Sequence, residues 1–160
     1  MITFISNFKT TVIGSINKDN TPFTSYAPFI YDSNKFYFYI SAIATHTKNI
    51  QRDKNVSLFF IEDESQTTNF FARKRISLQT VTTKIKRDSE RFEEIFSLYN
   101  EKFDAEMVTM LKGMTDFNLF EAEVQSGEAT FGFGEAYNIG GEFMNELVER
   151  KSSGGHHAKK

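Results

Sequence analysis

The sequence predicts a mainly β fold: a small antiparallel barrel with helices attached. About six short segments rich in β-branched and aromatic residues are separated by clusters of turn-forming residues. Two stretches between these segments have the three-to-four-residue spacing of amphipathic helices. A chain with so many short strands must close on itself or cover its edges, so a barrel is expected.

Composition favours one folded domain and excludes several kinds of chemistry. The 160 residues include 18 Phe and 6 Tyr but no Cys and no Trp. Without Cys there is no thiol nucleophile, no Cys-ligated metal and no CxxC redox pair. The formal net charge of -2 provides no basic field, so no nucleic-acid partner is expected. With no export signal and no apolar run long enough to span a bilayer, we expect a cytoplasmic protein without membrane contact.

The first two strands are expected to form a hairpin. Residues 8–16 are rich in β-formers, Asn17 to Asn20 supply the turn, and residues 21–31 form the second strand. Because proline donates no ladder hydrogen bond, Pro22 and Pro28 predict an edge, a bulge or a strand start.

The next three elements alternate strand, helix and strand. Residues 35–40 are apolar on both faces, which predicts burial on both sides, as when one face lines a barrel and the other meets a partner subunit or a ligand. Residues 42–53 show helical spacing, and residues 55–61 form a fourth strand.

Two helices are expected in the second half of the chain. A long β-rich stretch covers residues 70–85, and Asp88 is a candidate N-cap for a helix over residues 89–103. A shorter helix covers residues 105–112, with Gly113 as its C-cap.

The last strands are expected to form another hairpin. Residues 117–125 alternate, Ser126 and Gly127 supply a turn, and residues 129–139 return as the partner strand. Spacing of apolar residues then predicts two helical turns over residues 142–150. We therefore divide the chain into a barrel domain, 1–141, and a C-terminal helix and tail, 142–160.

Polar residues cluster at the start of the predicted helix 42–53. Ser41, Thr45, Thr47 and Lys48 combine hydroxyls, helix N–H groups and one cation, a combination suited to an anion or phosphate. His46 lies among them, and a locally bonded helix residue explains it equally well.

Two adjacent histidines, His156 and His157, lie in the polar C-terminal tail. A disordered tail or an expression scar is the plain interpretation. The alternative is a ligand-bearing tail, because the segment after Gly141 is long enough to reach another subunit.

Two arginines and an aromatic segment are further candidates. Arg73 and Arg75 are expected on one face of the strand 70–85, where they are surface charges or contacts to an anion. Phe133 lies in a Phe-Gly-Phe-Gly run whose flat face suits a bound ring, although bending at a barrel corner explains it as well. Asp116 at the start of a late strand has no functional signal of its own.

Several of these segments occur together in one known family. In order and spacing the chain resembles the haem-utilisation branch (HugZ/HutZ type) of the pyridoxamine 5'-phosphate oxidase-like, FMN-binding split-barrel superfamily. The resemblance rests on Thr24–Phe29, Ile40–Asn49, Val56–Leu58, Glu62–Glu64, Phe71–Arg75, Asp116–Phe117 and Gly132–Tyr137.

The resemblance implies a homodimeric, six- to seven-stranded antiparallel split barrel with flanking helices. It implies haem bound at the subunit interface as ligand and substrate, and degraded with oxygen and an external electron donor to release iron. By position, His156 or His157 would ligate the iron and Asp116 would support that ligand. Arg75, or Arg73, would lie near the open iron face.

The resemblance also leaves alternatives. The same cleft binds FMN elsewhere in the superfamily, with Ser41, Thr47 and Lys48 as matching phosphate contacts; Lys48 replaces a common Arg and loses its planar fork. The additional N-terminal domain of longer relatives has no counterpart in this sequence. A flavin-dependent oxidoreductase and a non-catalytic haem carrier or storage module therefore remain alternatives.

Overall fold

A computed structural model of the chain, described over residues 1–150, contains one antiparallel sheet and four α-helices in that range. The strands are β1 (Thr10–Ile16), β2 (Pro22–Pro28), β3 (Ile30–Asp32), β4 (Lys35–Ser41), β5 (Asn55–Ile61), β6 (Arg75–Ile85), β7 (Phe117–Gly132), β8 (Glu135–Gly140) and β9 (Glu146–Glu149). The helices are α1 (Ile2–Ile5), α2 (Thr45–Arg52), α3 (Glu90–Lys102) and α4 (Ala105–Gly113), with 3-10 turns η1 (Glu64–Gln66) and η2 (Phe70–Ala72).

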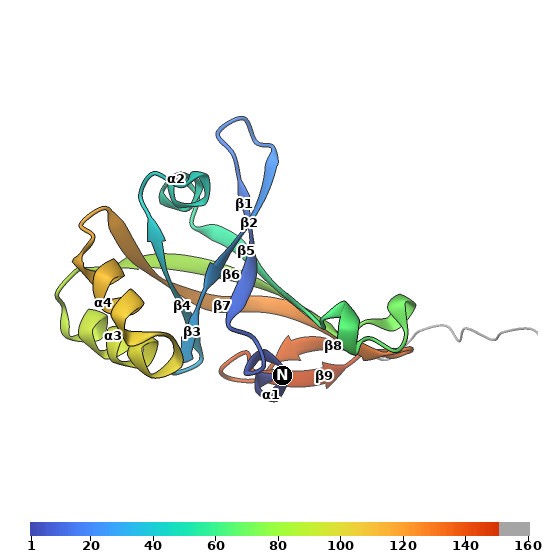
Figure 1. Cartoon of the computed structure of the whole chain (residues 1–160). Coiled ribbons are helices and arrows are strands. Elements are labelled where there is room, and N and C mark those ends of the chain that lie inside the picture. The colour runs from blue at the N-terminus through green and yellow to red at the C-terminus, as the bar shows by residue number, and fades with distance from the viewer. Residues whose placement is uncertain (151–160) are drawn as a thin grey trace, which may run out of the picture.

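Seven strands follow one path through the sheet, in the order β2-β1-β5-β6-β7-β4-β3, and β8 and β9 extend it from β7. The sheet curls so that β2, at one end of the path, approaches β4 near the other end (Figure 1). The mainly β antiparallel prediction is confirmed. For Pro22 and Pro28 the sequence allowed an edge, a bulge or a strand start; β2 lies at the end of the strand path, and Pro22 is its first residue.

Strand β4 is buried on both faces, as its sequence predicted. Phe36, Phe38 and Ile40 belong to the barrel core. Tyr37 and Tyr39 point the other way into a second core, formed with α3 and α4. The outer face is thus covered by the chain's own helices, as Figure 1 shows, and the expectation of a partner subunit or ligand there is wrong.

Helix α3 is amphipathic and begins one residue later than the cap prediction. The Ser89 hydroxyl caps it by accepting a hydrogen bond from the Phe92 N–H at 3.3 Å. Asp88 was expected in that role, but it has a left-handed backbone (φ 60°) and lies in the turn before the helix. Phe92, Ile95, Phe96 and Tyr99 then form the buried stripe.

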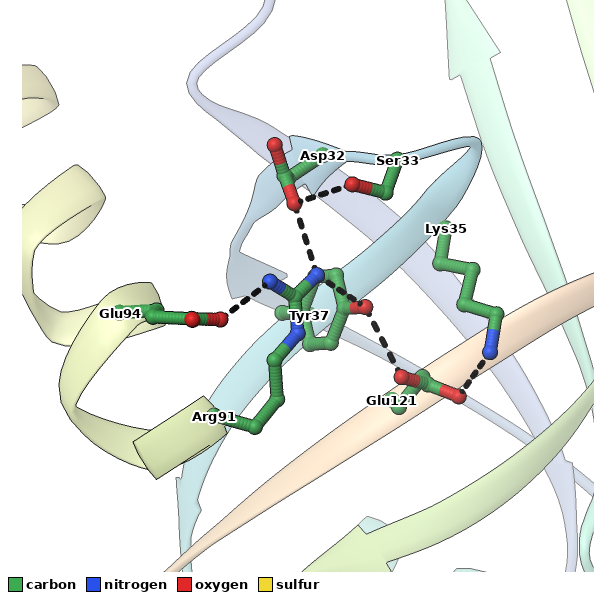
Figure 2. A network of polar contacts seen from close by, with 7 residues as sticks. All are labelled: Asp32, Ser33, Lys35, Tyr37, Arg91, Glu94 and Glu121. Carbon is green, nitrogen blue, oxygen red and sulfur yellow. Dashed lines mark hydrogen bonds and ion pairs between the residues drawn. The ribbon is translucent and has the colours of Figure 1, made fainter. Parts of the chain in front are cut away.

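A polar network ties α3 to the sheet at the start of β4 (Figure 2). Arg91 donates to Asp32 and to the Tyr37 hydroxyl, each at 2.7 Å, and Tyr37 donates to Glu121 on β7 at 2.8 Å. Lys35 completes the network with Glu121 at 2.6 Å. Burial raises the pKa of Tyr37 to about 12, so its hydroxyl remains a hydrogen-bond donor at physiological pH.

The predicted turn at Ser126 and Gly127 is wrong, because β7 continues through it. A bulge at Gln125 absorbs one residue opposite β6. Gly127 is needed for close approach: a Cβ there would lie 2.7 Å from the Ser77 carbonyl oxygen. The hairpin turn to β8 comes later, at Phe133 and Gly134, where Gly134 has φ +81°.

The predicted helix over residues 142–150 is also wrong. The chain turns at Gly141 (φ +84°) and returns as β9, which pairs with β8 from Gly140↔Glu146 to Tyr137↔Glu149. The free edge of β8 offers ladder hydrogen bonds, and these override the local helical spacing of Phe143, Met144 and Leu147.

We predict that Tyr99→Phe destabilises the protein by about 1–3 kcal/mol. The buried hydroxyl donates to the Tyr37 carbonyl at 3.1 Å and accepts from the Tyr39 N–H at 3.2 Å, which holds α3 against β4. Urea unfolding would measure the loss. Tyr26→Phe is the matched control because Tyr26 is 68% exposed; a Tyr99→Phe protein as stable as this control would contradict the prediction.

Candidate functional site

The candidate site begins where β4 ends and α2 starts. The chain reverses in a tight turn, with the Ala44 N–H bonded to the Ser41 carbonyl at 3.2 Å. The Thr47 hydroxyl donates to the same carbonyl at 2.6 Å and is fully buried. Thr47 therefore fixes the start of α2 with its side chain, whereas Thr45 and Lys48 are exposed there.

Ser41 connects this turn to the start of β7. Its hydroxyl donates to the Asp116 carboxylate at 3.1 Å, and the Ala42 N–H donates to the Asp116 carbonyl at 2.7 Å. Asp116 lies one residue before β7 and is exposed. The structure thus brings together Ser41 and Asp116, two residues 75 positions apart that the sequence singled out separately.

His46 contacts a residue that sequence reasoning did not select. Its Nδ1 lies 2.9 Å from the hydroxyl of Ser25 on β2. The imidazole is about half buried, and burial lowers the pKa of His46 below its ordinary value. Ser25 lies in a strand whose burial alternates, on the same side as Phe23 and Ala27. The alternation of Phe23, Ser25 and Ala27 along β2 was the signal that could have identified Ser25 as an inward-facing residue.

Arg73 and Arg75 lie at the other end of the long strand β6. The prediction that both lie on one face of a strand is wrong, because residues 70–72 form the 3-10 turn η2 and the strand begins at Arg75. Asn69 caps this turn by accepting from the Phe71 N–H, which breaks the extended pattern. Arg73 is paired with Glu64 at 3.1 Å and donates to the Glu62 carbonyl.

Arg75 keeps much of its guanidinium free. Its Nη1 donates to the Arg73 carbonyl at 3.1 Å, and no other partner is present among residues 1–150. Two exposed rings lie at the same end of β6: Phe71 follows η2's first residue and is 92% exposed, and Phe133, at the β7–β8 turn, is 84% exposed. A hollow of about 210 Å³ between η2 and this turn includes Ala72 and Phe133.

Within one chain, the residues at the start of α2 and Asp116 lie far from Arg75. Arg75 pairs with Thr130, whereas Ile85, at the other end of β6, pairs with Leu119 close to Asp116. Arg75 and Ile85 are ten residue steps apart along the strand, about 33 Å at the usual rise. In Figure 1 the green segment with η1 and η2 accordingly lies far from α2. His156 and His157 lie outside the described residues.

The described part of the chain shows no resident metal site of its own. Residues 1–150 contain no group of three or more His, Asp or Glu placed to hold a metal ion. Within that range, no helix has both the length and the apolar character needed to cross a bilayer.

Comparison with known proteins identifies the family. The sequence model of the pyridoxamine 5'-phosphate oxidase family matches residues 1–131. The chain belongs to this family. A relative from Vibrio cholerae, named heme oxygenase HutZ, is 33% identical over 140 residues, which cover 88% of this chain and 79% of that protein.

Similarity to solved structures confirms the split-barrel prediction. The crystal structure of HutZ from Vibrio cholerae, described there as a heme storage protein, matches with a TM-score of 0.76 and 32% identity, over 82% of this chain and 93% of that one. Campylobacter jejuni ChuZ matches with a TM-score of 0.86 and 28% identity, over 99% of this chain. The match spans 64% of the ChuZ chain.

We predict that His46 titrates below its ordinary pKa of about 6.5. Burial favours the neutral ring and so lowers the pKa of His46 in the folded protein. As the pH falls through the ordinary pKa, the unfolded chain therefore binds more protons than the folded one, and the free energy of unfolding decreases. His46→Gln should remove this component: between about pH 7.5 and about pH 5 the wild type should lose more stability than the variant.

Two measurements check the prediction. NMR titration of the histidine ring signals gives the pKa, with His46 assigned by its absence in the variant. Urea unfolding across the same pH range gives the stability difference. A His46 signal that titrates at or above 6.5, or equal pH dependence in both proteins, would contradict it.

Proposed function

We propose that this protein binds haem and degrades it oxidatively, releasing iron. The observation that carries the proposal is the 33% identity to heme oxygenase HutZ across 88% of this chain. The structure of the same relative is described as that of a heme storage protein, so haem is common to both descriptions.

The chemistry of the two residue groups suits haem. Haem is a flat apolar ring with two carboxylates and a redox-active iron. The end of β6 at Arg75 offers two exposed aromatic rings, Phe71 and Phe133, and a cation with free N–H donors. The start of α2 offers Lys48 and the Asp116 carboxylate.

We propose that a homodimer completes the site. The two groups lie at opposite ends of β6 in one chain, too far apart for one porphyrin to contact both. An antiparallel arrangement of two copies about a two-fold axis would place Arg75 of one copy near Asp116 of the other. Each dimer would then hold two equivalent sites.

In this proposal each residue has a defined role. His156 or His157 would ligate the iron, and Asp116 would accept a hydrogen bond from the other ring nitrogen, which raises the basicity of the ligand. The Asp116 Oδ2 already accepts from Ser41, which holds the carboxylate in place. Arg75, with Arg73 behind it, would present a fixed positive charge to the reacting face of the ring.

The iron would supply the redox chemistry, with oxygen and electrons from an external donor. The protein's contribution is to fix the ligand, its orientation and the charge around it. Ser41, His46, Thr47 and Lys48 would shape the ring's surroundings at the start of α2.

Two other functions have a specific observation in their favour. Storage without degradation follows from the description of the HutZ structure. FMN binding follows from the family name, with the anion-suited start of α2 at Ser41 and Lys48 as its phosphate site. A colourless protein that leaves added FMN unchanged in absorbance would exclude the second.

We predict that haem added to the purified protein gives a Soret band, and that the band collapses when His156 and His157 are both changed to Ala. The reason is that the double change would remove the imidazole nitrogen that the proposal assigns to the iron. Absorbance titration measures it, with Lys84→Ala, at an exposed residue without a role in the proposed site, as the control that should keep the band. A full band in the double variant would refute the ligand assignment.

We predict that Arg75→Met retains haem but slows its degradation about 10²–10³-fold, the usual effect of removing one fixed electrostatic donor. Loss of the haem spectrum and release of iron, with ascorbate and oxygen supplied, measure the rate. Lys84→Met is the control, because Lys84 is an exposed cation on the same strand. Stable haem in the wild type would instead support storage.

We predict that two inactive variants restore activity when mixed. In a shared site, dimers of Arg75→Met with Asp116→Ala contain one site with both changes and one site with neither. If the two variants are mixed in equal amounts and their subunits pair at random, about half of the dimers are mixed. About a quarter of all sites are then intact, so about a quarter of wild-type activity should return. After unfolding and joint refolding, no recovery despite confirmed mixed dimers would show that each site lies within one chain.

A further inference from the structure

A separate pocket lies between α1, β3 and α3. It has a volume of about 410 Å³, and its walls are mostly apolar. Ile2, Ile5, Phe29, Ile30 and Leu98 contribute to them. In Figure 1, α1 and α3 lie on the opposite side of the molecule from α2, and the pocket shares no residue with the candidate site.

Lys102 is the cation of this pocket. Its side chain is half buried, and its Nζ lies 3.9 Å from the ring centre of Phe29 and donates to the Phe29 carbonyl at 3.0 Å. An ammonium group has three N–H donors, so two remain for another acceptor. Among residues 1–150 no carboxylate lies within ion-pair distance of Lys102.

The charges around Lys102 leave its positive charge uncompensated. Burial, followed by the nearby Lys9 ammonium, lowers the pKa of Lys102. The two carboxylates at the pocket do not neutralise it: Asp32 is paired with Arg91 at 2.7 Å, and Glu101 is exposed without an ion pair to Lys102. A half-buried cation in this position favours an anionic partner.

We propose that this pocket binds an aliphatic monocarboxylate, with the carboxylate on Lys102 and the chain along Ile2, Ile5, Ile30 and Leu98. The volume falls in the range of small-molecule sites, about 300–1,000 Å³. The walls, more apolar than polar, match a hydrocarbon chain. This site goes beyond the proposed haem function and does not depend on it.

The same chemistry, a carboxylate on an apolar body, also occurs in the propionates of a porphyrin. The experiment therefore has to separate the two sources. We use decanoate below its micelle concentration as the fatty-acid probe, and protoporphyrin IX as the competitor.

Isothermal titration of the haem-free protein with decanoate tests the proposal. Wild type should bind it, and decyltrimethylammonium, which has a similar chain and the opposite charge, should not. Lys102→Met should weaken binding about tenfold to hundredfold, as expected for a charge-assisted hydrogen bond, and Lys102→Arg should restore most of it. Lys86→Met, at an exposed lysine before α3, is the control.

A second variant covers the possibility that Lys102→Met unfolds the protein. Leu98→Trp leaves the lysine in place but fills the pocket, so a folded Leu98→Trp protein should not bind decanoate. The proposal is overturned if wild type does not bind decanoate, if either variant binds as well as wild type, or if equimolar protoporphyrin IX displaces the decanoate.

Discussion

Strand β4 is buried on both faces, and most of the fold follows from how the chain covers them. Phe36, Phe38 and Ile40 require a closed sheet on one side, which the long antiparallel strands β6 and β7 help to form. Tyr37 and Tyr39 require a cover on the other, which α3 supplies through its apolar stripe. Their hydroxyls cannot be left unpaired, so the Tyr37 network with Arg91 and Glu121 accompanies the packing.

The candidate site depends on the same strand. The end of β4 at Ser41 is held beside Asp116 by pairing with β7, and the turn that follows positions α2 so that His46 meets Ser25. The length of β6 then separates this group from Arg75. In the proposed dimer, each sheet would carry two half-sites, and the two-fold partner would complete each of them. The many aromatic residues divide accordingly: two cores within the chain, and exposed rings at the Arg75 end.

Most of the strands, helix α3 and the fold family could be predicted from the sequence. The strands near 10–16, 22–28, 35–41 and 55–61 and the helix α3 follow from local periodicity, which depends only on which residues must face the core. Pro22 and Pro28 restricted their positions to an edge, a bulge or a strand start, since proline lacks the donor that a central strand needs. The family motifs identified the fold, because spacing and order survive where individual contacts vary.

The features that sequence reasoning got wrong or missed depend on contacts between residues distant in the chain. Gly127 and the segment 142–150 have local patterns that predict a turn and a helix, yet close approach of β6 in one case and the open edge of β8 in the other made both into strands. The sequence by itself determined the strand-rich fold, its cysteine-free chemistry and the residues available for a site. Only the folded chain decided that Ser25 meets His46 and that Arg75 lies apart from Asp116, because such contacts are set by register across the sheet.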